Sequence, residues 1–242
     1  MRYIKRLPIQ LTAMLMIASL VTLKGQPNTN SFDCSRELMK IEHAMNDTTH
    51  ISFQATSNMH FNNGAHETYS FDYKVSKDKL SIRGSDSTEI IQNEVFSLAV
   101  KNRLKKAELS WSKSVLNYIL RVHVHSASFN EKFVASRSFV DSGNYRILSY
   151  HFKGGPYTQY DIVYSKSTHR IQSIRYSFGG TKSSSPDSPF PYTVNVQFSN
   201  YQTGGFNDSV FNTDAWFLRR NGVYYMVAPY ENYILINSLN HK

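Results

Sequence analysis

The sequence predicts a mainly β protein whose strands form a curved antiparallel sheet with one apolar face. In residues 51–61 the odd positions are apolar, apart from one serine, and the even positions are all polar. This is the period of a strand with one buried and one solvated face. The same alternation returns in residues 69–75, after the tight-turn pair Asn63-Gly64, and a second turn at residues 76–79 leads into Leu80 and Ile82. The region predicts three consecutive antiparallel strands.

Further strands and two helices are expected along the chain. Asp33 is placed to cap a helix that carries Leu38, Ile41 and Met45 on one face. Ser112 or Ser114 is placed to cap a short apolar helix at residues 115–120, which we expect to lie across the sheet. The other strands are expected at residues 88–92, 95–100, 104–109, 133–140, 145–153, 159–165, 170–178 and 192–199, with short segments in the tail around the turn Asn221-Gly222.

The first twenty-five residues have the pattern of a cleaved signal peptide. Arg2, Lys5 and Arg6 precede an apolar run at residues 11–23, which is too short to span a bilayer as a helix. Gly25 suits a cleavage site, and an uncleaved membrane anchor is the alternative. Because no cysteine follows the apolar run directly, we expect a periplasmic or secreted protein without a lipid anchor. Residues 1–25 are then the signal peptide and residues 26–242 a single β domain.

Composition argues against nucleic acid as a partner. The net charge of +9 includes four basic residues of the expected signal peptide, and without them 23 basic residues face 18 acidic ones. This excess is mild, and no basic run with interleaved aromatic residues follows the chain. The one cysteine, Cys34, has no partner for an internal disulfide, so stability depends on the core. We expect a monomer.

No pattern in the sequence predicts catalysis, a cofactor or a metal site. There is no Gly-x-Ser-x-Gly elbow around a serine nucleophile, and the glycine pairs are not followed by a helix as in a phosphate loop. His123 and His125 would share one face of a strand, but the spacing assigns no third metal ligand, and His151 and His169 have no fixed relation to them. We therefore expect a protein that is not an enzyme, with solvent-facing strand histidines and an incidental thiol at Cys34.

The order of these elements resembles the periplasmic lipoprotein-carrier family of the LolA/LolB type. The resemblance covers residues 33–198 and depends on the segments SFQATSNMHFNNGAHETYSFDY, KDKLSI, EIIQNEVFSLAVKNRLKKAEL and YDIVYSKSTHRIQSIRYSF. It implies an open half-barrel in which the helices cover the concave face and acyl chains bind there. Ser81 stands where the family has a basic residue, and Arg83 lies two positions further on, so a ligand other than a lipoprotein fits the pattern better.

The apolar face of the sheet is the candidate binding site. Its members are expected to contact a lipid, a lipoprotein acyl chain or another apolar ligand: Phe53, Ala55, Met59, Phe71, Tyr73, Leu80, Val196 and Phe198. Such a face must be covered, so two alternatives remain open at this point. Two sheets packed face to face would form a filled core, as in a sandwich. The protein would then be a structural or interaction protein of the bacterial envelope, with a protein partner and no ligand.

Overall fold

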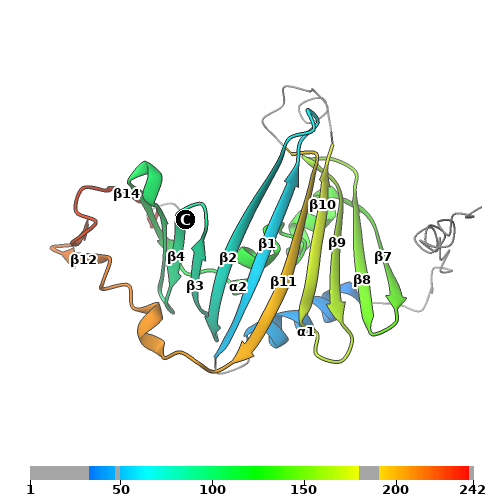
Figure 1. Ribbon diagram of the computed structural model, residues 1–242, viewed down its shortest axis with the longest axis horizontal. Helices are drawn as coiled ribbons and strands as arrows, with labels where there is room; N and C mark the ends of the chain where they lie inside the picture. The colour runs from blue at the N-terminus through cyan, green and yellow to red at the C-terminus, as the bar shows by residue number, and fades with distance from the viewer. Residues whose placement is uncertain (1–32, 47–49, 180–190, 240–242) are drawn as a thin grey trace, which may run out of the picture. The chain divides into compact units, whose positions relative to one another are not determined.

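The computed structural model describes residues 33–46, 50–179 and 191–239. Its main element is a curved, open sheet of twelve strands in the order β14-β6-β5-β4-β3-β2-β1-β11-β10-β9-β8-β7 (Figure 1). Every neighbouring pair is antiparallel except β14 with β6. The mainly β, antiparallel half-barrel predicted from the sequence is confirmed. The predicted signal peptide lies outside the described residues.

The alternating segments of the sequence form the centre of the sheet. The strands on one side are β1 (Ile51–His60), β2 (His66–Ser76), β3 (Lys79–Gly84), β4 (Thr88–Gln92), β5 (Phe96–Lys101) and β6 (Lys106–Trp111). Those on the other are β7 (Val134–Ser142), β8 (Tyr145–Phe152), β9 (Tyr157–Ser165), β10 (Ile171–Phe178) and β11 (Thr193–Thr203). β1 lies between β2 and β11, so it joins the two series.

Helices cover one face of this sheet, behind the strands in Figure 1. In α1 (Cys34–Asn46), the Asp33 carboxylate accepts hydrogen bonds from the backbone N–H groups of Ser35 and Arg36 at 2.9 and 3.2 Å, which confirms the predicted cap. In α2 (Val115–Leu120), Ser114 is the capping residue. A third helix, α3 (Ala127–Phe133), was not predicted and begins after Ser126, whose hydroxyl accepts from Phe129 N. Among the described residues no helix has the length and apolar character needed to cross a membrane.

The sheet has apolar cores on both faces, at different ends. The larger core lies on the concave face, between α1, α2 and strands β1–β3 and β8–β11. The smaller core lies on the opposite face of β4–β6, under the C-terminal segment. Alternation on β5 separates the two, because Ser97 Oγ hydrogen-bonds to Tyr118 of α2 at 2.6 Å while the neighbouring Leu98 packs in the smaller core. The C-terminal segment contains η2 (Asp208–Phe211), β12 (Phe217–Arg220), β13 (Val223–Met226) and β14 (Ile234–Asn237).

Some local expectations are wrong. The predicted strand at residues 104–109 begins later, at Lys106, because the 3₁₀ helix η1 (Asn102–Leu104) and the left-handed Lys105 precede it. His123 and His125 lie in the loop between α2 and α3 and not on a strand. The apolar residues at the end of the chain form β14, which pairs in parallel with β6 across a long connection. A parallel pairing of distant segments leaves no local turn signal in the sequence.

We expect Gln92→Met to destabilise the fold strongly. Gln92 is fully buried, its amide donates to the carbonyls of Asp78 and Lys113 at 2.7 Å each, and its oxygen accepts from Lys113 N at 3.0 Å. The substitution leaves these backbone groups without their partner, at a cost of about 2–3 kcal/mol. Urea unfolding measures the loss. Gln197→Met, on the exposed face of β11, is the control and should change stability by less than about 0.5 kcal/mol; equal losses for both variants would contradict this account.

Candidate ligand-binding face

The structure brings the eight predicted site residues together on the concave face. Seven of them are buried in the larger core: Phe53, Ala55, Phe71, Tyr73, Leu80, Val196 and Phe198. Met59 is half-buried and packs against the same core. Strand register explains the grouping, since Ala55 faces Phe71 on β2 and Phe198 on β11. The rings of Phe53 and Tyr73 stack at 4.7 Å, so this part of the face is closely packed beneath the helices.

Two small residues interrupt the bulk in the middle of the face. Ala55 and Ser57 follow each other on the buried side of β1, and both are buried. Ser57 lies between Tyr69 of β2 and Val196 of β11. Its hydroxyl has no hydrogen-bond partner among the described residues, although the residue is fully buried. The centre of the concave face therefore contains a buried hydroxyl that no described residue satisfies.

One end of the concave face is aromatic and only partly covered. We define the aromatic end as Phe129, Phe152, Tyr157, Tyr176 and Phe178, contributed by α3, β8, β9 and β10. Its rings form a chain, with centroid separations of 6.0 Å for Phe129–Phe152, 5.8 Å for Phe152–Tyr157 and 5.1 Å for Tyr157–Phe178. All except Tyr176 are half-buried and pack against the larger core. Apolar surface that continues the core thus reaches solvent at this end.

Arg121 is the cation of the concave face. It follows α2 in a left-handed conformation, with φ 58°, and its guanidinium lies 4.8 Å from the ring centroid of Phe71. The arginine is exposed to solvent, whereas Phe71 beneath it is 8 % exposed. Tyr73 and Tyr176 lie close enough to oppose the loss of its charge. Arg121 therefore connects the β2 side of the face with the aromatic end.

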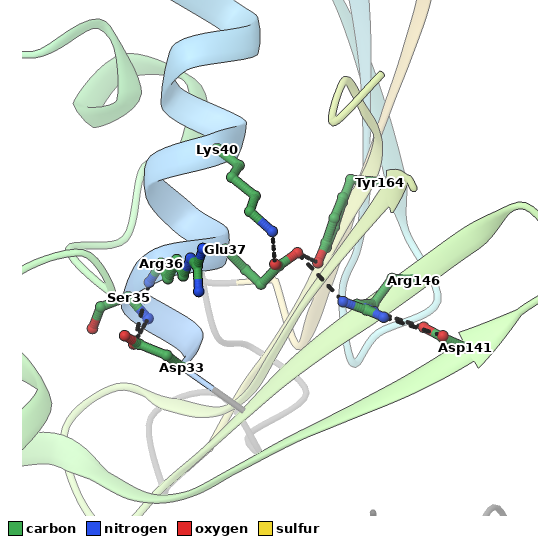
Figure 2. Close-up of polar contacts among 8 residues, drawn as sticks. All are labelled: Asp33, Ser35, Arg36, Glu37, Lys40, Asp141, Arg146 and Tyr164. Carbon is green, nitrogen blue, oxygen red and sulfur yellow. Dashed lines mark hydrogen bonds and ion pairs between the residues drawn. The ribbon is translucent and has the colours of Figure 1, made fainter. Parts of the chain in front are cut away.

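A polar cluster fastens α1 to the strands beside this face (Figure 2). We call it the Glu37 cluster: Glu37, Lys40, Asp141, Arg146 and Tyr164. The Glu37 carboxylate accepts from Tyr164 OH and from Lys40 Nζ at 2.6 Å each, and Arg146 Nη1 lies 3.4 Å away. Arg146 in turn donates two bonds to the Asp141 carboxylate, at 2.6 and 3.1 Å. Helix α1 is thereby tied to β7, β8 and β9.

The charges of this cluster support one another. Burial opposes ionisation of Glu37, but the hydrogen bonds from Lys40 and Tyr164 outweigh it and hold the pKa of the carboxyl below its ordinary 4.5. Burial and the bond to Glu37 raise the pKa of the Tyr164 phenol, which stays protonated and donates. Arg146 holds the pKa of Asp141 below its usual value. The carboxylates of the cluster are therefore ionised and paired at neutral pH, and Tyr164 donates to Glu37.

The other residues singled out in the sequence do not form a site. The rings of His123 and His125 lie 5.8 Å apart in their loop, and burial lowers the pKa of His125. Within the described part of the chain, no three His, Cys, Asp or Glu side chains are grouped to hold a metal ion. Cys34 is buried in the first turn of α1, and burial raises the pKa of its thiol, which makes it a poor nucleophile.

Comparison with known proteins finds similarity in fold only. No family model and no curated protein matches the sequence. An uncharacterized conserved protein of Thermus thermophilus is 9 % identical, with a TM-score of 0.46 over 84 % of this chain and 97 % of that one. A LolA superfamily protein of Nitrosomonas europaea is 10 % identical, with a TM-score of 0.39 over 76 % and 99 %. The MucA/MucB complex of Pseudomonas aeruginosa matches at 12 %, with a TM-score of 0.36 over 73 % and 59 %. These similarities say nothing of a family, ligand, partner or activity.

The sequence pattern identified the apolar residues of the concave face, but it did not identify the Glu37 cluster or Arg121. Glu37 and Tyr164 are 127 positions apart, and only the tertiary fold brings them together. The sequence does not single out Arg121, because one arginine after a helix forms no periodic pattern. Its place directly after four buried apolar residues of α2 was the available clue.

We expect the Glu37 cluster to make stability depend on pH. Because the folded pKa of Glu37 is lowered, its contribution is present above pH 4.5 and is lost as pH falls through the folded pKa. Glu37→Gln should cost about 2 kcal/mol at pH 7 and less at pH 3, where the folded carboxyl begins to be protonated. Urea unfolding at the two pH values measures the difference, with Glu131→Gln on exposed α3 as the control. A deficit of equal size at both pH values would contradict the assignment.

Proposed function

We propose that this protein is a non-enzymatic binding protein of the bacterial envelope, which holds a lipid or another apolar ligand on its concave face. The observation that carries the proposal is the aromatic end, where half-buried rings continue the larger core into solvent. Burying each methylene of an acyl chain against such a surface is worth about 0.8 kcal/mol. A ligand that covers these rings gains this energy without any rearrangement of the closely packed floor.

Entry beyond the aromatic end requires movement of a helix. Phe53, Leu80 and Phe198 are buried beneath the present cover, so a chain that reaches them displaces α1 or α2. Helix α1 is held by the Glu37 cluster, and Glu42 of α1 accepts a hydrogen bond from Ser114 at the start of α2 at 2.7 Å. The two helices are thus linked, and we propose that they move together. In this proposal the eight predicted site residues contact the deep part of the ligand.

The second candidate function is that of an interaction protein with a filled core. Exposed apolar side chains at the C-terminal segment favour it: Ile234 is 62 % and Ile236 47 % exposed on the edge strand β14. A groove of about 540 Å³ lies beside the β12–β13 hairpin, lined by residues that include Leu218, Tyr225 and Met226. An unpaired edge with apolar side chains is a common docking surface for another chain. In this reading the envelope partner is a protein, and the concave face holds no ligand.

Export to the periplasm or the medium is part of the proposal. It depends on the basic and apolar pattern of residues 1–25. We expect N-terminal sequencing of the exported protein to begin near Gln26. A chain that retains Met1 and stays with the membrane would contradict cleavage.

Native mass spectrometry of the gently purified protein tests the function directly. We expect a bound species of lipid mass that organic solvent extracts, together with saturable binding of a fluorescent acyl probe. A bare protein that binds no probe would overturn the lipid-binding proposal and favour the interaction protein.

Met59→Ser locates the binding surface. Met59 is half-buried on the concave face of β1, so the loss of its side chain should reduce probe affinity about tenfold, because roughly 1–2 kcal/mol of apolar contact is removed. His60→Ser is the matched control, because the adjacent side chain is exposed on the other face of the same strand. Titration of both variants with the acyl probe compares them. Equal affinities for the two variants would place binding elsewhere.

A further inference from the structure

Arg121 has a charge that no described carboxylate neutralises. None of the carboxylates in the described part of the chain lies within ion-pair distance of its guanidinium. Asp86 is the acidic group that acts on it from further away, and the Asp86 carboxylate already accepts two hydrogen bonds from Thr88, at 2.9 and 3.0 Å. By contrast, Arg146 is paired with Asp141 and Glu37, and Arg83 lies 3.6 Å from Glu89. The cation over the apolar face thus has the hydroxyls of Tyr73 and Tyr176 as polar partners and no carboxylate among the described residues.

The surroundings of Arg121 suit an anion attached to an apolar chain. A guanidinium has five N–H donors in a plane and binds carboxylate or phosphate through two parallel bonds. The ring of Phe71 lies against the guanidinium, the Tyr73 and Tyr176 hydroxyls hydrogen-bond with it, and part of the residue is exposed to solvent. Tyr176, which lies close to Arg121, is also 5.9 Å from Tyr157 of the aromatic end. A head group at the guanidinium is therefore next to the half-buried rings that would cover an acyl chain.

We propose, on the basis of the lipid-binding function above, that Arg121 binds the anionic head group of the ligand, which is an acyl chain ending in a carboxylate or a phosphate. The guanidinium neutralises the head group at the open side of the concave face, and the chain packs along Met59, Tyr157 and Phe178. The protein thus prefers anionic to neutral lipids of the same chain length.

Neighbouring hydroxyl groups are suited to assist. Burial raises the pKa of Tyr73 and of Tyr176, with Arg121 opposing the rise, so both phenols stay protonated and able to donate to an anion. Ser57 lies diagonally from Phe71 on the same face, since its partner Tyr69 is two residues from Phe71 on β2. Its hydroxyl, without a partner among the described residues, is a further potential donor on the concave face.

Fluorescence titration with matched probes tests this. The probes are dansylaminoundecanoic acid and its methyl ester, and competition by oleoyl lysophosphatidic acid and by monooleoylglycerol separates phosphate from carboxylate and from a neutral head. We expect the wild type to bind the acid about tenfold or more tightly than the ester. Arg121→Gln should abolish this preference, because it weakens binding of the acid far more than binding of the ester. The matched control is Arg175→Gln on β10, an exposed arginine next to Tyr176 on the opposite face, and it should keep the preference.

The other possible results either support or overturn the head-group assignment. A wild type that binds acid and ester equally, or a preference that survives Arg121→Gln, overturns the head-group assignment and leaves lipid binding in place. No binding of any probe overturns both proposals. If Arg121→Gln lowers the melting temperature sharply, Arg121→Lys, which keeps the charge but not the planar fork, replaces it. A preference reduced several-fold in that variant supports the assignment, and an unchanged one overturns it.

Discussion

The structure depends on how one apolar sheet face is covered. The concave sides of β1–β3 and β8–β11 are apolar, and a sheet face of this kind has to be removed from water. The described part of the chain supplies three helices for this purpose, of 13, 6 and 7 residues. Under α1 and α2 the face is fully buried, with Ile41, Met45, Leu116 and Leu120 at 0–1 % exposure. Beside α3, which has no fully buried residue, the aromatic end stays half-open. Part of the apolar surface is therefore accessible because the described helices do not cover the whole concave face.

The opposite face of the sheet carries a buried apolar core at β4–β6, and the C-terminal segment covers it there. Side chains alternate along β5, so Ser97 faces α2 while Leu98 and Val100 face Trp216 and the rest of the smaller core. A network joins that segment to the sheet, since Asp208 pairs with Lys79 at 2.7 Å and with His50 at 3.0 Å. The two faces of the sheet thus carry separate hydrophobic cores. The larger core on the concave face extends over β1–β3 and β8–β11.

Period-two alternation carried most of what the sequence revealed about the fold. It placed β1, β2 and β11 and grouped the eight floor residues correctly on one buried face, because register follows once one face must be buried. Capping by Asp33 and Ser114 was visible for a similar local reason. What failed was non-local: the parallel pairing of β14, the contact between Glu37 and Tyr164, and the position of Arg121 over Phe71. Each of these contacts joins segments that are far apart in the sequence, and neither a periodic pattern nor a turn motif indicates which distant segments come together.

Polar groups on the concave face argue for a ligand over a filled core. A core that serves only stability gains nothing from a buried hydroxyl, and an unsatisfied one costs about 1–3 kcal/mol. Yet Ser57 and Tyr150 both bury hydroxyls without a partner among the described residues, and Arg121 places a charge above Phe71. Replacing Ser57 by alanine would remove this desolvation cost and change the packed volume only slightly. Under the proposed function, a ligand with a polar head would give these groups hydrogen-bond partners, and part of their desolvation cost would then be recovered as affinity.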